Sequence, residues 1–193
     1  MKCDLFNRKR LLIVAGPTGC GKSTFLKSAL GNKPSPLAKQ ILKKAFKRSD
    51  FKIQQLYFRR LQKLHEKQEG FKKFTDKYNN FILDVDTTGP KFKKNAEIFT
   101  NFLAEFNHIT SIQIYTPYEV WLNRILERKI HSSLKGSRSI RRVLHKSFSL
   151  KLIERDRARK TYDSYYDRWE STLLNHNIDN QIRVDTIQGI ILE

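Results

Sequence analysis

The chain lacks a run of 18 consecutive apolar residues, so we expect no membrane-spanning helix. No apolar stretch follows Met1, so we expect no signal peptide. Only 2 cysteines are present, and because Cys20 lies in a tight loop motif, a structural disulfide with Cys3 is not expected. We therefore expect a protein of the reducing cytoplasm. Internal repeats and low-complexity linkers are also missing, and 193 residues suit a single domain over 1–193.

Acidic residues are scarce, because 19 Asp and Glu stand against 38 Lys and Arg, which gives a formal net charge of +19. The excess is concentrated in two segments. Residues 33–80 hold 14 basic and 4 acidic residues, and residues 124–160 hold 13 and 3. Such segments are either solvated surface or binding sites for a polyanion, which includes a nucleotide, another phosphorylated acceptor and a nucleic acid.

The most informative motif is G-x-x-x-x-G-K-[ST], which occupies residues 16–23. The apolar run 11–15 precedes it and is typical of a strand buried on both faces. Residues 22–30 follow with helical spacing, and Gly31 is expected to end that helix in the left-handed conformation. Strand, loop and helix thus occur in the order that a phosphate-binding loop requires.

The residue types of this loop match the chemistry of nucleotide binding. Glycines let the backbone point its N–H groups at an anion, and the helix that follows adds unpaired N–H groups and its dipole. Lys22, expected at the surface, can reach the β- and γ-phosphates, while the Ser23 hydroxyl can ligate Mg²⁺. The sequence therefore predicts binding of ATP or GTP with Mg²⁺ at Gly16, Pro17, Thr18, Gly19, Cys20, Gly21, Lys22, Ser23 and Thr24.

A second buried strand, residues 81–86, carries two aspartates at its end and is followed by the turn 87–90. A carboxylate at the end of such a strand lies near the phosphates and can bind Mg²⁺ directly or through water. Asp84 and Asp86 face the same way, so the pattern does not choose between them. Because Asp86 is nearer the strand end, we assign it to the acceptor hydroxyl and Asp84, with Ser23, to the metal.

The remaining chain alternates helices and strands. Strands separated by helices imply a parallel sheet with helices on both faces, which is a three-layer α/β fold. Residues 130–146 are basic and weakly periodic, and we expect a mobile loop there. Helices are expected over 36–46, 95–106 and 148–176. A further helix should begin at 49–50 and include Leu64, and another should begin at the capping box 116–119. The remaining strands are expected over 111–115 and 182–186.

With these motifs, the chain resembles the P-loop kinases of the nucleoside monophosphate kinase type. Residues 16–23 match their phosphate loop, residues 124–131 look like the lid entrance of adenylate-kinase-like enzymes, and residues 182–186 look like their last strand. The resemblance implies that Arg124 lies near the nucleotide base. It also implies that Arg128, together with arginines of the lid, contacts phosphates.

Residues 84–90, in contrast, are more similar to P-loop kinases of the polynucleotide-kinase and zeta-toxin style. We therefore predict a P-loop NTPase fold with a helical basic insert on the acceptor side at 33–80 and a basic lid at 129–147. The predicted activity is Mg²⁺- and ATP-dependent phosphoryl transfer to a small anionic acceptor, phosphorylated or nucleotide-like, with Lys22, Asp86 and Arg128 as catalytic residues. Two alternatives stay open: a kinase acting on the ends of RNA or DNA, and an NTP-hydrolysing switch or nucleotide-binding subunit.

Overall fold

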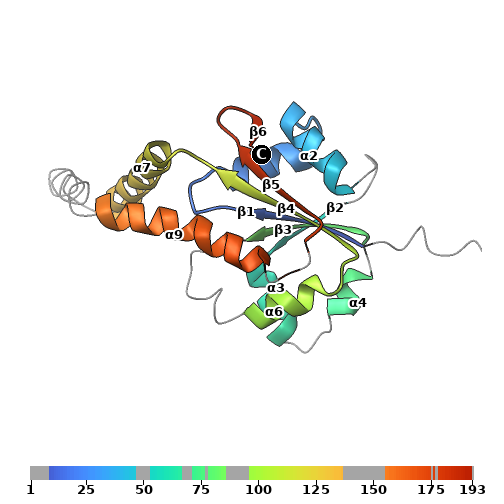
Figure 1. Cartoon of the computed structure of the whole chain (residues 1–193). Helices are drawn as coiled ribbons and strands as arrows, with labels where there is room; N and C mark the ends of the chain where they lie inside the picture. The colour runs from blue at the N-terminus through green and yellow to red at the C-terminus, as the bar shows by residue number, and fades with distance from the viewer. Residues whose placement is uncertain are drawn as a thin grey trace, which may run out of the picture.

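A six-stranded sheet, in the order β2-β3-β1-β4-β5-β6, forms the centre of the computed structural model (Figure 1). The structure describes residues 9–46, 53–66, 71–76, 78–85, 96–136, 155–174, 176 and 178–192. All strand pairs are parallel except β5 with β6, which confirms the predicted α/β class. The strands are β1 (Arg10–Ala15), β2 (Ile53–Tyr57), β3 (Asn80–Val85), β4 (His108–Tyr115), β5 (Asn180–Asp185) and β6 (Ile190–Leu192).

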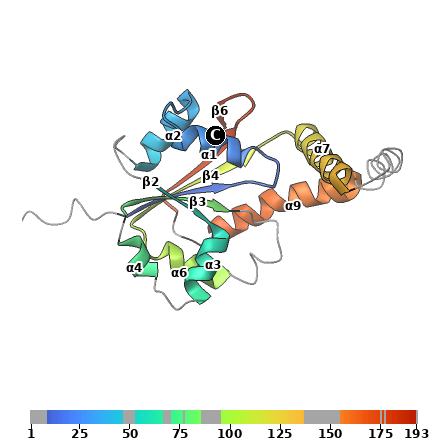
Figure 2. The ribbon, with the colours of Figure 1, turned by 180° about the vertical axis from the view of Figure 1, so that it is seen from behind.

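Helices cover both faces of the sheet (Figures 1 and 2). On one face lie α1 (Lys22–Leu30) and α2 (Pro36–Phe46), and on the other lie α3 (Phe58–Glu66), α4 (Phe71–Thr75) and α6 (Ala96–Leu103). The helix α7 (Tyr118–Gly136) lies at the carboxyl ends of the strands, and α9 (Arg155–Leu174) runs from there along the face that α3 and α6 cover, where Trp169 joins the core (Figure 1). Within the described residues, no helix is both long enough and apolar enough to cross a membrane.

The composition of β1 follows from its place in the middle of these layers. Leu11 and Ile13 pack into the core beneath α3, α4 and α6, while Leu12 and Val14 pack into the core beneath α1 and α2. Each of these side chains is at most 1% exposed. A strand that is covered on both faces needs an apolar residue at every position, which is why the run was recognisable from the sequence.

The position of β1 also places the loop that follows it. In the sheet, β1 lies between β3 and β4. The strands that follow β1 in the chain lie first on one side of it (β2 and β3) and then on the other side (β4 to β6). In open parallel sheets, ligands bind at such a reversal, outside the carboxyl ends of the strands. Residues 16–21 connect β1 to α1 at this point, and α1 has the bounds that the sequence predicted.

One predicted helix is wrong in its first part. Residues 53–57 form β2, which pairs with β3, and the helix α3 begins only at Phe58. The apolar spacing at Ile53, Leu56 and Leu61 fits a helix, but a short segment of this kind is ambiguous by periodicity alone. Pairing with β3 gives its backbone groups partners, so tertiary context decided. The segment 33–80 is therefore not wholly helical, and its role on the acceptor side stays a prediction.

Two further expectations at the ends of elements are corrected. Gly31 has φ −78° and ψ 165°, which is extended backbone rather than a left-handed cap. The strand at 180–185 is not the last one, because a tight turn at Gly189, with φ 70°, leads into the antiparallel β6. A glycine adopts this left-handed conformation without steric cost, which permits the hairpin.

The predicted lid segment is helical where it is described. The helix α7 continues to Gly136, whereas a mobile loop was expected from Ile130. Residues 137–147, which complete the predicted lid, lie outside the described residues, as do the first residues of the helix expected from 148.

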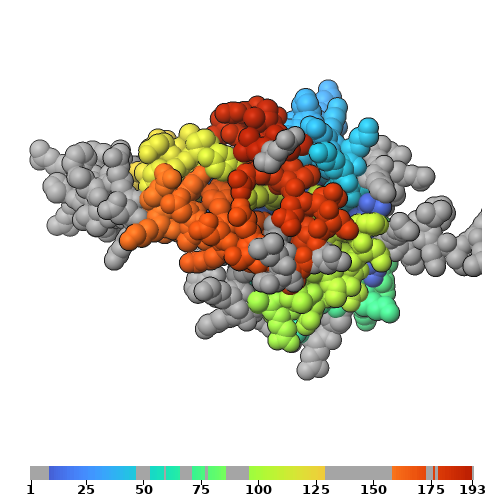
Figure 3. Space-filling model, viewed as in Figure 1, coloured from blue at the N-terminus to red at the C-terminus, as the bar shows by residue number. Residues whose placement is uncertain are grey.

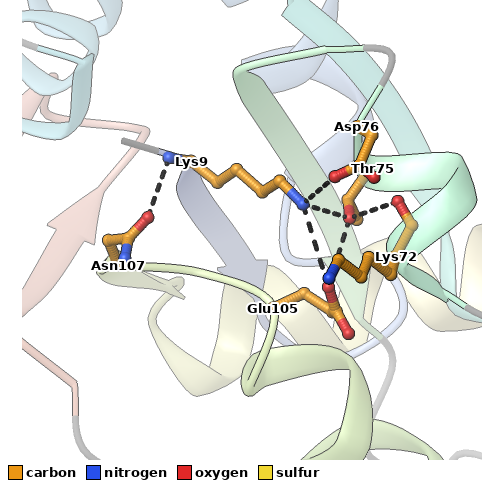
Figure 4. Close-up of polar contacts among 6 residues, drawn as sticks. All are labelled: Lys9, Lys72, Thr75, Asp76, Glu105 and Asn107. Carbon is orange, nitrogen blue, oxygen red and sulfur yellow. Dashed lines mark hydrogen bonds and ion pairs between the residues drawn. The ribbon is translucent and has the colours of Figure 1, made fainter. Parts of the chain in front are cut away.

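Lys9 lies just before the amino end of β1, at the end of the strand opposite to the phosphate loop, and is held there by several polar contacts (Figure 4). Its ammonium donates to Thr75 Oγ1 at 2.9 Å and to Asp76 Oδ1 at 2.6 Å, and it lies 3.8 Å from Glu105 Oε2. Its backbone N–H donates to Asn107 Oδ1 at 3.1 Å. These contacts join the start of β1 to α4 and to the turn before β4.

Candidate nucleotide-binding site

One pocket at the carboxyl edge of the sheet collects most of the predicted site residues. Its volume is about 490 Å³, within the range of small-molecule sites. The loop, the start of α1, the end of β3 and one face of α7 form its walls. The lining residues are Pro17, Thr18, Gly19, Gly21, Lys22, Ser23, Thr24, Asp84, Arg124, Glu127 and Arg128.

The loop requires glycine at two positions for both conformation and space. Gly19 has φ 95° and Gly21 has φ 105°, which lie in the left-handed region that L side chains rarely adopt. A Cβ atom on Gly19 would lie 3.0 Å from Ile125 Cδ1, and one on Gly21 would lie 3.0 Å from Thr186 Oγ1. The loop is therefore held between α7 and the turn after β5.

Cys20 lies beneath the loop and not in the pocket wall. Its side chain is buried, and a Cβ on Gly16 would lie only 2.4 Å from its sulfur. Both residues therefore shape the floor of the loop.

Lys22 is folded back onto the loop instead of projecting from the surface as expected. Its side-chain nitrogen donates to the carbonyl oxygen of Gly16 and, at 3.3 Å, to that of Pro17, and the residue is only 9% exposed. A lysine ammonium has three donors and no acceptor, and these two carbonyls supply acceptors inside the loop. Ser23 and Thr24, by contrast, are exposed and line the pocket.

Asp84 faces the pocket because of its position on β3. Side chains alternate along a strand, and Ile82 packs into the core beneath α1 and α2, so Asp84 lies on that same face. It is half-buried and pairs in register with Val14, the residue before the last one of β1. Carboxylate and hydroxyl oxygens are ligands that suit Mg²⁺, so Asp84 and Ser23 fit the predicted metal site. Asp86 lies outside the described residues.

One face of α7 adds charged groups to the same pocket. Arg124 and Arg128 lie four residues apart, and Arg124 Nη1 donates to the carbonyl oxygen of Gly19 at 3.3 Å. Glu127 lies on this face too and was not predicted as a site residue. Its spacing of three residues from Arg124 is the signal that could have revealed it. The lid arginines at 138–142 lie outside the described residues.

Thr116, just before α7, and Trp121, near the start of α7, also hold the loop in place. Trp121 Nε1 donates to the carbonyl oxygen of Thr18 at 2.9 Å. Thr116, expected to cap the helix, donates its hydroxyl to the carbonyl oxygen of Cys20 at 2.7 Å and is fully buried. The carbonyl groups of Thr18 and Cys20 are thus both fixed by side chains from outside the loop.

Tyrosines of α9 complete the support of the site and were also missed. The Tyr165 hydroxyl accepts a hydrogen bond from the Gly16 N–H at 2.9 Å, and Tyr162 donates to the Thr116 carbonyl at 2.5 Å. Burial raises the pKa of Tyr162 and of Tyr166 well above the usual value, so both hydroxyls stay protonated donors even in alkaline solution. Tyr162, Tyr165, Tyr166 and Trp169 follow helical spacing, which is the available sequence signal.

The amino-terminal part of the chain matches a known family. The sequence matches the family model described as the Rad17 P-loop domain over residues 1–112, and no curated protein matches it. Among solved structures, the crystal structure of APE1195 aligns with TM-score 0.42 and 13% identity, over 69% of this chain and 75% of that chain. Shikimate kinase from Acinetobacter baumannii, in complex with shikimate, aligns with TM-score 0.35 and 13% identity, over 94% of this chain and 87% of that chain.

The family match covers the elements that build the phosphate side of the pocket. Residues 1–112 include β1, the loop, α1 and β3 with Asp84, and they make up more than half of the chain. The resemblance to the P-loop superfamily is thereby confirmed. This chain belongs to the Rad17 P-loop domain family and is a nucleotide-binding P-loop NTPase domain.

Proposed function

We propose that this protein is a Mg²⁺- and ATP-dependent phosphotransferase that acts on a small phosphorylated or nucleotide-like acceptor. The observation that carries the proposal is the shared pocket of Lys22, Asp84 and Arg128, which come from three separate elements. Phosphoryl transfer needs little covalent chemistry from a protein, since positioning and charge neutralisation supply most of the catalysis. These three groups supply both charge and position.

In the proposed complex, the backbone N–H groups of the loop and the ammonium of Lys22 hold the phosphates. Lys22 exchanges the carbonyl oxygens of Gly16 and Pro17 for phosphate oxygens. This exchange is favourable because hydrogen bonds between two charged groups are stronger than those to a neutral carbonyl.

Ser23 and Asp84 are proposed to hold Mg²⁺, whose charge when bound offsets that of the β- and γ-phosphates. Asp86 is proposed to orient or deprotonate the acceptor hydroxyl. The metal assignment is supported by the exposed Ser23 and the half-buried Asp84 in the same pocket, whereas the assignment of Asp86 follows only from its place in the sequence.

The two arginines of α7 are proposed to act at different ends of the nucleotide. Arg124 is tied to the loop at Gly19 and lies 3.8 Å from a Cβ built on Gly21, near Thr186, which favours the base side. Arg128, one turn further along α7, is proposed to neutralise the transferring phosphoryl group, since guanidinium is planar and always charged. The basic segments 33–80 and 129–147 are proposed as acceptor platform and lid.

A transfer assay tests this function. ATP or GTP labelled in the γ-phosphate is incubated with the full chain, Mg²⁺ and a panel of nucleotides, phosphorylated metabolites and oligonucleotides. We expect label on a small acceptor. Label on oligonucleotide ends alone would instead support a polynucleotide kinase.

An NTP-hydrolysing switch is the second candidate, because the family match ends at residue 112, before the arginines of α7. Release of labelled phosphate to water that no acceptor suppresses or diverts would support the switch and contradict the phosphotransferase.

A further inference from the structure

The layer formed by α1, α2 and the turn between them carries positive charge without any acidic residue. Residues 16–46 hold six lysines and no Asp or Glu, so the layer contains no partner for this charge. Lys22 lies in the phosphate loop, and the other five, the α1–α2 lysines, are exposed: Lys27, Lys33, Lys39, Lys43 and Lys44. Among the described residues, none of these five lines the nucleotide pocket or forms an ion pair.

The helix α2 directs its lysines away from the sheet. Its buried residues, which include Leu37, Ala38 and Ile41, pack into the core between the helices and the sheet. Lys39 and Lys43 lie four residues apart on the opposite, exposed side of the helix. Figure 3 shows α2, in blue, at the surface of the molecule, with red residues of the β5–β6 part between it and α7. The outer side of α2 therefore lies apart from the arginines of α7.

Other layers of the protein do not share this one-sided charge. On the opposite face of the sheet, the basic residues of α3 and α4 are accompanied by Asp76, Glu97 and Glu105. Helix α9, residues 155–174, holds five basic and four acidic residues. A high lysine content of the whole chain would affect every layer equally, so the lack of acidic residues around the α1–α2 lysines is a local feature.

A surface of exposed ammonium groups suits a polyanion, and the described residues disfavour a membrane as that polyanion. Helices that lie on a membrane bury apolar side chains in it, but the apolar side of α2 is already in the core. Within the described part of the layer, Leu30, at 38% exposure, is the one large apolar side chain that is exposed. The phosphate backbone of a nucleic acid needs no apolar contact, because its binding is driven by charge and by the release of counterions.

The uncharged residues of this surface favour a duplex, and RNA in particular. Single strands are bound by stacking bases on aromatic side chains, and no described aromatic side chain of the layer is exposed. Asn32 and Gln40 are exposed beside the lysines, and a side-chain amide both donates and accepts hydrogen bonds. The 2′-hydroxyl of RNA also donates and accepts, and duplex RNA is recognised mainly through its phosphates and 2′-hydroxyls.

We propose that the α1–α2 surface binds double-stranded RNA without reading its base sequence. The α1–α2 lysines contact phosphates, while Asn32 and Gln40 contact 2′-hydroxyls. The RNA lies outside the nucleotide pocket, so it is not the acceptor of the proposed phosphotransferase. The proposal also differs from a polynucleotide kinase, because binding along a duplex requires no free end.

Fluorescence anisotropy tests the proposal with the full chain, without ATP, and a labelled RNA duplex of about 20 base pairs. If four or five lysines each neutralise one phosphate, log affinity should fall with log salt with a slope of roughly −4. Lys39→Gln combined with Lys43→Gln should make the slope shallower by about 2 and weaken binding at low salt by about tenfold or more. Lys72→Gln combined with Lys73→Gln, exposed on α4, removes the same charge and should leave binding nearly unchanged.

Two further ligands separate RNA along its length from other nucleic acids. A closed dumbbell RNA, which has no ends, should bind as tightly as the open duplex. Duplex DNA of the same sequence should bind several-fold more weakly, and Gln40→Ala should reduce this preference. Binding of the open duplex alone would assign the surface to RNA ends, and equal affinity for DNA would show that the 2′-hydroxyl is not recognised, so either result would overturn the proposal.

Two more results would also overturn it. Equal losses in the α2 and α4 double variants would show that only the net charge of the chain matters. Binding to vesicles that contain phosphatidylserine, without measurable affinity for RNA, would assign the surface to a membrane. If the α2 double variant fails to fold, Lys27→Gln combined with Lys33→Gln provides the same comparison.

Discussion

The backbone N–H of Gly16 donates a hydrogen bond to the hydroxyl oxygen of Tyr165 at 2.9 Å, across a sequence separation of 149 residues. Gly16 is the first residue of the phosphate loop, and Tyr165 lies in the middle of α9. The loop motif is local in sequence, but this bond makes its conformation depend on a helix far along the chain. Because both groups are buried, losing the bond leaves the Gly16 N–H without a partner.

The variant Tyr165→Phe tests this dependence. It should lower the free energy of unfolding by about 1–3 kcal/mol, the usual cost of an unpaired buried polar group, and weaken ATP binding. Thermal denaturation and titration calorimetry measure the two effects. Tyr78→Phe, at a partly buried position two residues before β3, is the matched control. An unchanged melting temperature together with unchanged ATP affinity would show that the bond does not support the loop.

Lys22→Met retains most of the side-chain volume in the loop but removes the ammonium. We expect transfer to fall by about 100-fold or more, because a positioned donor to developing negative charge is lost, and ATP binding to weaken. The control is Lys27→Met, an exposed position on the same helix. A folded Lys22→Met protein with normal affinity for ATP–Mg²⁺ in calorimetry would refute the assignment of the loop.

Substitutions of Asp84 and Asp86 should cause two different kinds of catalytic defect. Asp84→Asn should shift the Mg²⁺ concentration needed for half-maximal turnover, since a metal ligand is weakened. Asp86→Asn should lower the rate at saturating Mg²⁺ while ATP binding is retained. Asp163→Asn, an exposed position on α9, controls for the charge change. If turnover is normal in both variants at every Mg²⁺ concentration, this strand end is structural.

The two arginines of α7 should differ because only one of them contacts the loop. Arg124→Ala removes the bond to the Gly19 carbonyl and should weaken ATP binding as well as turnover. Arg128→Ala should lower turnover by a factor on the order of 10³, with ATP affinity largely kept, as for an arginine that neutralises transferring phosphate. Arg168→Ala, exposed on α9, is the control. Equal effects of both variants on affinity would contradict the division of roles.

Salt dependence distinguishes a small acceptor from a nucleic acid. If the basic segments neutralise about six phosphates of an oligonucleotide, log affinity should fall with log salt with a slope of roughly −4 to −5. A compact acceptor releases few counterions, so its affinity should fall far less. We expect the shallow dependence, measured by titration across a salt series. Tight oligonucleotide binding with the steep slope, in competition with turnover, would favour the polynucleotide kinase.

The sequence alone predicted those helices and site residues that are determined by residues close to them along the chain. The bounds of α1 and α2 follow from the loop motif and from Ser35, whose hydroxyl accepts from the Ala38 N–H at 3.2 Å. Such caps and apolar runs act within a few residues, so they can be read without knowing the fold. The pocket residues Lys22 and Asp84 were predicted for the same reason, because each ends or follows a recognisable buried strand.

Tertiary contacts decided the rest. Residues 53–57 form a strand because their backbone groups pair with those of β3. The Lys22 side chain lies against the loop because the carbonyl groups of Gly16 and Pro17 accept hydrogen bonds from its ammonium. Glu127 and Tyr165 meet the loop only after α7 and α9 pack against it. Local propensity and periodicity depend on residues that are close together in the sequence, so they can be recognised before the fold is known. A contact across 149 residues depends on how whole helices and strands pack, so only the folded structure reveals that contact.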